Sequence, residues 1–308
     1  MISKLEELKI QTNCEVCGSH NIVKSFTYQD RHYNAVKNDF NVWQCKDCFL
    51  FFINPMPSTD ELVSYYPNTY YAYEDKIRDS ALKKRLVKLL RVEPSDLDNI
   101  PTATSEKILD FGCGSGWSLD LYKEKGFDTY GLEMDKKAII AAEKNGHNMS
   151  GIDLLSTNYE SDFFDFIRSN HSMEHVNNPA EVVKEFRRIL KTNGELFISC
   201  PNSGSLTRSI FGKYWYYTGV PFHTYNYRLS NLKILLENNG FSIKKVGYRS
   251  SWQGIFGSLA VFLNRNTDKA SSDSFFVNKF FRIIGLFLSK FTDLINRGES
   301  IEIYACKK

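Results

Sequence analysis

The chain has 308 residues, of which 42% are hydrophobic and 24% are charged, and its formal net charge is +3 at pH 7. This length and composition are typical of a globular protein with one large domain and room for a small one. The mild charge gives no indication of a nucleic-acid partner, and no uncharged apolar run is long enough to span a membrane. The first residues do not have the pattern of a signal peptide, so we expect a cytoplasmic protein.

Two cysteine pairs near the N-terminus have the spacing of a metal site. Cys14 and Cys17 form one Cys-x-x-Cys pair, and Cys45 and Cys48 form the other. In a chain that is not exported, paired cysteines favour metal binding over disulfides. Four thiolates make a closed tetrahedral zinc site with no open position for catalysis. With short strands between the pairs, residues 1–54 are predicted to be a zinc ribbon whose Zn²⁺ is structural.

Residues 55–104 are predicted to be a connector with lid helices. Ser58 and Glu61 have the spacing of a helix start with a capping acid. A tyrosine-rich stretch follows at 65–71, and an amphipathic basic helix is expected at 81–91. Packing in a core and a solvated surface are the alternatives for these two segments.

A glycine-rich turn comes next. A strand at 108–111 leads into Gly112, Gly114 and Gly116, and a helical pattern follows. Glycine permits unusual backbone angles and close approach to a ligand, and a helix start presents N–H groups to an anionic group. Dinucleotide folds use Gly-x-Gly-x-x-Gly against a diphosphate. Here the spacing is Gly-x-Gly-x-Gly, and Asp110 stands ahead of it. A turn without a ligand is the remaining alternative.

Asp110 together with this spacing resembles motif I of the class I S-adenosylmethionine (SAM) methyltransferases. The resemblance implies SAM as the cofactor, held by the three glycines, with Asp110 facing its ammonium group. It also implies an α/β fold with a Rossmann-like seven-stranded sheet, here over residues 105–308. In methyltransferases with a similar cysteine module, a tyrosine stretch like that at 65–71 covers the cofactor.

Two more acids follow at predicted strand ends. Glu133 lies at the end of a strand over 129–134, where one carboxylate can accept hydrogen bonds from both ribose hydroxyls. Met134 beside it belongs to the same predicted cofactor site. Asp153 ends a third strand, and the resemblance implies that it accepts from the adenine amino group. A solvated loop carboxylate is the alternative for Asp153.

A fourth strand at 163–167 precedes a segment that contains His171, Glu174 and His175. The segment resembles a signature of the group that includes the ubiquinone O-methyltransferases. In those enzymes an acid pair and a histidine of this segment can hold a divalent ion, but here His171 replaces the upstream acid. His171 is a candidate general base, and His175 could orient the acceptor. The letters also spell the inverted zinc-peptidase motif, which requires a long helix instead of a strand end.

The match continues with a helix over 179–190, closed by a glycine cap at Gly194, and a strand over 195–200. Residues 203–228 then form an aromatic-rich insertion on the acceptor side. Its segments 212–215 and 221–223 resemble an insertion of bacterial methyltransferases of polysaccharide or lipid-linked sugar pathways. His223 is therefore the first candidate for a substrate-facing acid or base, and a purely hydrophobic clasp is the alternative.

The last two strands are expected at 241–248 and 300–305, with an apolar helical insertion at 252–297 between them. Bulky apolar residues interrupted by Lys and Arg suit a helix that lies in a membrane surface. Burial against the protein or against a partner chain is the alternative.

Together these features predict a SAM-dependent methyltransferase that acts on a small-molecule or lipid-linked saccharide acceptor by O- or N-methylation. Peripheral contact with the inner face of the membrane through 252–297 would fit a lipid-linked acceptor. An RNA-modifying methyltransferase that binds RNA through the ribbon is the alternative, and the mild net charge disfavours it.

Overall fold

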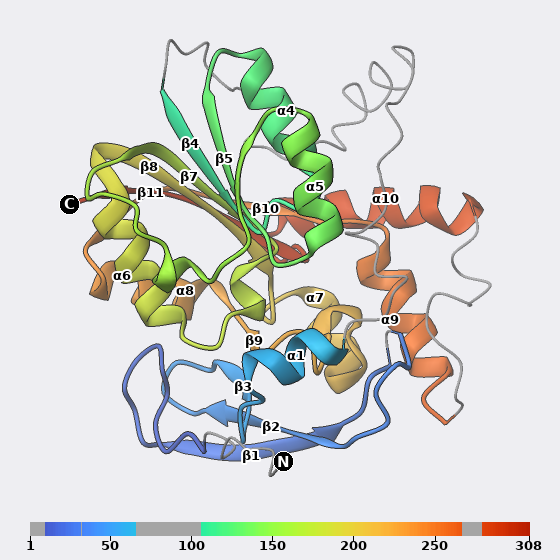
Figure 1. The fold of residues 1–308 in the computed structure, drawn as a ribbon. Coiled ribbons are helices and arrows are strands. Elements are labelled where there is room, and N and C mark those ends of the chain that lie inside the picture. The colour runs from blue at the N-terminus through green and yellow to red at the C-terminus, as the bar shows by residue number, and fades with distance from the viewer. Residues whose placement is uncertain (1–9, 32, 66–105, 267–278) are drawn as a thin grey trace, which may run out of the picture.

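The computed structural model describes residues 10–31, 33–65, 106–266 and 279–308 (Figure 1). Most strands form one sheet with the order β10-β11-β8-β7-β4-β5-β6. Its strands are β4 (Lys107–Phe111), β5 (Asp128–Leu132), β6 (Asn148–Ser150), β7 (Phe164–Asn170), β8 (Leu190–Pro201), β10 (Phe241–Arg249) and β11 (Ser300–Lys307). Neighbours run parallel except for β11, which is antiparallel to β8 and β10. The predicted Rossmann-like seven-stranded fold is confirmed.

Helices cover both faces of this sheet. α4 (Trp117–Glu124) and α5 (Lys136–Lys144) lie on one face, and α6 (Pro179–Ile189) and α8 (Leu229–Asn238) lie on the other (Figure 1). Central strands of a doubly covered parallel sheet are apolar on both sides. The buried residues of β4, β7 and β8 accordingly include Ile108, Leu109, Phe164, Ile167, Leu196 and Ile198.

The end of α6 differs from the prediction of a glycine cap at Gly194. Leu190 is already extended and begins β8, and Asn193 takes the left-handed conformation with φ of 64°. Gly194 is required for a different reason. A Cβ there would lie 2.9 Å from the Leu190 side chain and 3.0 Å from the carbonyl oxygen of Asp165. Close packing therefore selects this glycine.

The cysteine-bearing segment forms a second, antiparallel sheet with the order β1-β2-β3-β9. β1 (Ile22–Tyr28), β2 (Phe40–Cys45) and β3 (Phe51–Ile53) come from the N-terminal segment, whereas β9 (Tyr225–Asn226) comes from the acceptor-side insertion. Phe52 pairs with Tyr225 across the junction. The ribbon and the insertion therefore share one sheet, which the sequence did not predict.

The connector begins as predicted. The Ser58 backbone N–H donates to Glu61 Oε2 at 2.9 Å, and the Glu61 N–H donates to Ser58 Oγ at 3.2 Å. This reciprocal pair opens α1 (Thr59–Tyr65). The tyrosines that follow Tyr65 and the predicted helix at 81–91 lie outside the described residues.

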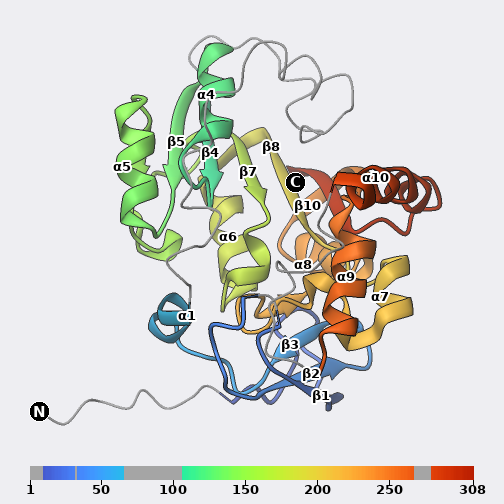
Figure 2. The ribbon, with the colours of Figure 1, turned by 90° about the vertical axis from the view of Figure 1, so that its right-hand side faces the viewer.

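The apolar C-terminal insertion contains α9 (Gln253–Leu263) and α10 (Lys279–Leu294). The two helices pack on each other, and α9 also packs on α7 (Leu206–Phe211) of the acceptor-side insertion (Figure 2). The C-terminal half of α10 carries exposed apolar side chains, since Phe287 is 76% exposed and Leu294 is 82% exposed. In the part of the chain that the structure describes, every helix is too short or too polar to cross a bilayer.

Candidate functional site

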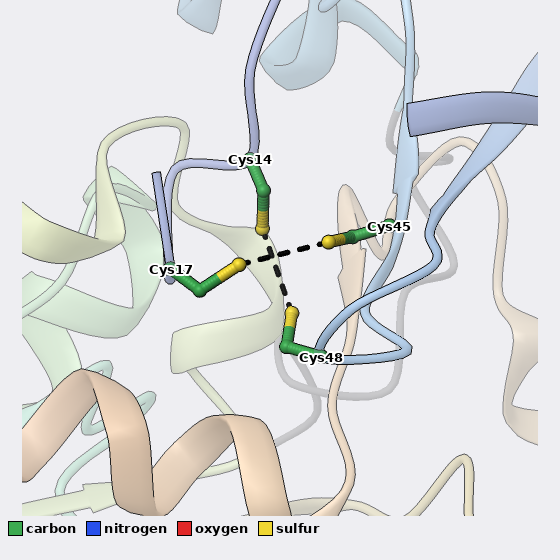
Figure 3. A group of neighbouring side chains, drawn as sticks. All are labelled: Cys14, Cys17, Cys45 and Cys48. Carbon is green, nitrogen blue, oxygen red and sulfur yellow. Dashed lines mark hydrogen bonds between the residues drawn. The ribbon is translucent and has the colours of Figure 1, made fainter. Parts of the chain in front are cut away.

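The four predicted zinc ligands come together at the end of the ribbon (Figure 3). Cys14 Sγ lies 3.6 Å from Cys48 Sγ, and Cys17 Sγ lies 3.6 Å from Cys45 Sγ. All four sulfur atoms lie within 4.8 Å of one another, and none belongs to a disulfide. Sulfur atoms at about 2.3 Å from a tetrahedral Zn²⁺ are about 3.8 Å apart, so the donor set fits a zinc ion.

Each cysteine pair is closed by a residue with positive φ. Gly18 has φ of 74° and Phe49 has φ of 64°. Their N–H groups donate to the carbonyl oxygens of Cys14 and Cys45 at 2.8 and 2.9 Å. The two knuckles thus have the same backbone geometry, although only the first uses glycine for it.

The glycine turn after β4 has the geometry that its sequence requires. Gly112, Gly114 and Gly116 all have positive φ, at 74°, 55° and 83°. A Cβ on Gly112 would overlap the side chain of Ser172, which lies in the loop after β7. A Cβ on Gly116 would lie 3.0 Å from Ala142 Cβ. The turn is therefore packed tightly against the β7 loop and α5.

Asp110 is enclosed by protein groups. Its side chain is fully buried, both carboxylate oxygens lie 3.1 Å from Arg168 Nη1, and Ser118 Oγ also donates to it. The carboxylate is therefore paired within the protein, and its predicted contact with the ammonium group of SAM stays a prediction. Asp110 ties β4 to β7 and to the first turn of α4. Arg168 was missed, although a lone cation in an apolar strand indicates a buried partner.

Glu133 connects the ends of β4 and β5. Its Oε2 accepts from the Gly114 N–H at 2.9 Å, and its Oε1 accepts from the N–H groups of Met134 and Asp135 at 2.7 and 3.1 Å. Asp135 caps α5, because it accepts from the Ala138 N–H at 2.8 Å. Glu133 therefore lies directly under the glycine turn.

Asp153 is exposed and accepts from the Leu155 N–H at 2.8 Å, at the start of the short 3₁₀ turn η2 (Leu154–Ser156). Two apolar side chains near it are also exposed, Met134 at 49% and Ile152 at 48%. They follow β5 and β6, at the same edge of the sheet as the glycine turn. Ile152 was not predicted as a site residue.

The three candidate histidines surround a residue that was not predicted to be central, Glu174. Glu174 lies in the 3₁₀ turn η3 (Met173–His175) after β7 and is 1% exposed. His171 Nδ1 lies 3.3 Å from Glu174 Oε1. Burial raises the pKa of Glu174, but the contact with His171 and the charge of the neighbouring imidazoles outweigh it and lower that pKa to about 2. The carboxylate is thus ionised inside the protein.

His175 and His223 lie against each other beside Glu174. Their ring centroids are 4.9 Å apart and their planes meet at 78°. His175 Nδ1 donates to the Phe222 carbonyl oxygen at 2.8 Å, and His223 Nδ1 donates to the Tyr217 carbonyl oxygen at 2.9 Å. The structure therefore brings together the β7 loop and the acceptor-side insertion, which His175 and Phe222 join across 47 positions of the chain.

Comparison with known proteins identifies the family. A family model described as "Methyltransferase domain" matches residues 75–246, which is more than half of the chain. The chain belongs to this methyltransferase family. The methyltransferase is 27% identical over 186 residues to a ubiquinone biosynthesis O-methyltransferase of Pelagibacter ubique, covering 55% of this chain and 74% of that protein. It is 25% identical over 155 residues to the enzyme of that name from Acinetobacter baumannii, covering 46% and 65%.

The solved structures agree with the fold. A SAM-dependent methyltransferase from Archaeoglobus fulgidus superposes with a TM-score of 0.51 at 23% sequence identity, covering 78% of this chain and all of that chain. This likeness shows the fold, and the family match makes the protein a SAM-dependent methyltransferase. SAM is its cofactor, and the glycine turn with Glu133 lies at the edge of the sheet where ligands bind in open α/β folds.

Proposed function

We propose that this methyltransferase transfers a methyl group to a hydroxyl group of a saccharide acceptor that is small or linked to a lipid, with N-methylation as the variant for an amino sugar. The observation that carries the proposal is the position of Glu174, His175 and His223 beside the glycine turn. Ser172 packs on Gly112, so the histidine group begins within two residues of the wall of the cofactor site. A hydroxyl acceptor needs such a group to lose its proton, whereas an amine needs much less help.

Cofactor binding is assigned to the edge formed by β4, β5 and β6. Glu133 would hold the ribose hydroxyls, the glycine turn would lie against the methionine part, and the exposed Met134 and Ile152 side chains would contact the adenine. Asp153 would accept from the adenine amino group. Asp110 acts indirectly, by fixing the turn through Ser118 and Arg168. SAM supplies an electrophilic methyl group when bound, and the chain aligns the acceptor and excludes water.

The aromatic insertion serves two purposes. Trp215, Phe222, Tyr225 and Tyr227 are buried, so they form the hydrophobic clasp that was the alternative interpretation. Tyr214, Tyr216 and Tyr217 are only half-buried, and these rings are the ones available to contact a sugar face. The insertion is thus partly packing and partly acceptor surface.

A cleft beside the insertion favours a saccharide that carries phosphate. Its volume is about 240 Å³, and it lies between β1 and the 3₁₀ turn η4 (Gly212–Tyr214). Arg31 and Lys213 line it together with one acid, Asp39. Phosphate groups of nucleotide-linked or lipid-linked sugars are anions that arginine and lysine side chains bind.

We also propose a structural Zn²⁺ on the four cysteines of the ribbon, residues 1–54, and peripheral contact of α10 with an anionic membrane. The C-terminal half of α10 exposes three apolar side chains next to the exposed Lys290, namely Phe287, Phe291 and Leu294. Apolar side chains beside a cation suit the boundary of lipid headgroups. Co-sedimentation with vesicles that contain anionic lipid tests this contact. Retention of a Phe287→Glu variant equal to that of the unchanged protein would contradict it.

The acceptor is tested by incubating the enzyme with isotope-labelled SAM and a panel of nucleotide-linked sugars, polyprenyl-linked sugars and phenolic quinone precursors. We expect label and the mass of one methyl group on a sugar. Methylation of phenolic compounds alone would contradict the proposal and assign the chain an acceptor like that of its ubiquinone relatives.

A further inference from the structure

Glu174 is a buried charge without a complete set of protein partners. Within the described part of the chain neither of its carboxylate oxygens accepts a hydrogen bond of good geometry, and the 3.3 Å separation from His171 Nδ1 is an ion-pair contact only. An ionised carboxylate that is removed from water is strongly destabilising unless cations or donors surround it. The two oxygens point to a cation that binds there.

The two neighbouring imidazoles are oriented in the way that metal ligands are. A carbonyl oxygen can only accept, so the bonds to Phe222 and Tyr217 place the Nδ1 proton on His175 and on His223. When such a ring loses its second proton on metal binding, Nε2 carries the lone pair. Metal-binding histidines regularly donate their other N–H to a backbone carbonyl, which fixes the tautomer and the ring orientation.

The ligand atoms are close enough to share one ion. One ligand atom from each of Glu174, His175 and His223 lies within 4.8 Å of the other two. Ligand atoms at about 2.1 Å from a tetrahedral ion are about 3.4 Å apart, so the three side chains would have to move together by about 1 Å when the ion binds. The backbone is also fixed, because the Glu174 carbonyl oxygen accepts from the Thr224 N–H and hydroxyl at 2.8 and 3.0 Å.

We propose that Glu174, His175 and His223 bind one divalent transition-metal ion, separate from the four-cysteine site. Two imidazoles and a carboxylate suit Zn²⁺ or Fe²⁺. The set is not the acid pair and histidine of the ubiquinone enzymes. His171 replaces the upstream acid and contacts Glu174 without being one of the three ligands. The third ligand, His223, comes from the acceptor-side insertion.

Three protein ligands leave a position open for the acceptor. This role rests on the proposed function, whereas metal binding itself does not. A hydroxyl oxygen bound there would have a lower pKa. Its proton would pass to His171, whose side chain is 35% exposed, and from there to water. The remaining oxyanion would attack the methyl carbon of SAM, form the C–O bond, and release the thioether product.

The experiment is a titration of the full-length protein with Co²⁺ after metal removal, read by absorption. Absorption from thiolate-to-metal charge transfer arises only at the four-cysteine site. Co²⁺ that adds weaker ligand-field bands and no further charge-transfer absorption is bound at the new site. We expect two equivalents in the unchanged protein. His223→Gln should keep the thiolate signal, which shows that the chain is folded, and weaken the second site by at least about 100-fold, more than loss of an orienting partner does.

His20→Gln is the matched control, because His20 also donates from Nδ1 to a backbone carbonyl, that of Thr12 at 3.2 Å, but lies outside the cluster. It should retain both equivalents. A single equivalent with only the thiolate signal in the unchanged protein would overturn the inference, as would an unaltered second site in His223→Gln. If the protein binds one metal ion and methylates a sugar, the proposed function holds and the second metal site is wrong. If it binds two metal ions and methylates no sugar, the second metal site holds and the proposed function is wrong.

Discussion

Asp110 and Arg168 lie opposite each other on the neighbouring parallel strands β4 and β7 and form an ion pair, with both side chains at most 5% exposed. Their contact determines how the glycine turn is held, because Asp110 also accepts from Ser118 at the start of α4. The acid that the resemblance assigns to SAM is thus held by two protein groups that connect the glycine turn to β7 and α4.

Asp110→Asn should therefore unfold more easily and bind SAM weakly as a consequence. Removing one partner of a buried ion pair destabilises a protein by about 3–5 kcal/mol, because the other charge stays buried. Denaturant unfolding measures the loss. Glu181→Gln is the control, since it breaks the exposed pair with Lys184 and should change stability by less than about 1 kcal/mol. If Asp110→Asn is as stable as the unchanged protein but does not bind SAM, Asp110 contacts the cofactor directly.

Glu133→Gln should weaken SAM binding by about 10- to 100-fold, because hydrogen bonds to a charged acceptor are about twice as strong as neutral ones. Calorimetric titration with SAM measures the change. Asp153→Asn is the companion variant, and we expect a smaller effect because Asp153 is exposed. If both variants lose SAM affinity equally, the assignment of the main ribose contact to Glu133 is wrong.

Gly112→Ala separates backbone strain from crowding when it is compared with Gly18→Ala. Both glycines have φ of 74°, but a Cβ on Gly18 meets no atom within 4 Å, whereas one on Gly112 overlaps Ser172. Gly18→Ala should therefore lose only about 1–2 kcal/mol, and Gly112→Ala should lose about 1–3 kcal/mol more. Unfolding curves give both values. If Ser172→Ala does not recover part of the second loss, the crowding explanation is wrong.

Stability should fall as the pH rises from about 4.5 to about 7. Burial raises the pKa of Glu299 from 4.5 to about 7, although Thr207 and Trp215 donate hydrogen bonds to it. The folded state therefore binds the proton more tightly than the unfolded state in this range. The difference corresponds to about 3 kcal/mol.

Denaturant unfolding at several pH values tests this dependence, and Glu299→Gln should remove it. The opposite slope in the unchanged protein would show that an acid with a lowered pKa dominates in that range instead.

Removing zinc from the ribbon should lower the free energy of unfolding strongly, since structural zinc contributes on the order of 10 kcal/mol in small zinc domains. Thermal unfolding before and after treatment with a chelator measures the effect, and added Zn²⁺ should reverse it. An unchanged melting temperature after verified loss of metal would contradict a structural role.

The sequence predicts features that depend on local pattern. The apolar runs of the central strands, the glycine turn and the Ser58–Glu61 cap all arise from residues close together in the chain. The partner of Asp110 could not be predicted in this way, because Arg168 is 58 positions away and its strand contains other polar residues that do not pair with Asp110. Likewise, Glu174 becomes buried only when the insertion that carries Thr224 and His223 folds back over it.

The pairing of β3 with β9 connects the ribbon to the acceptor-side insertion. β9 follows His223 by two residues, so the sheet that the cysteines organise also anchors the chain at the acceptor side. Loss of metal from the four cysteines would therefore lower the turnover number without any contact with a reactant. A less ordered ribbon would no longer hold His223 next to Glu174.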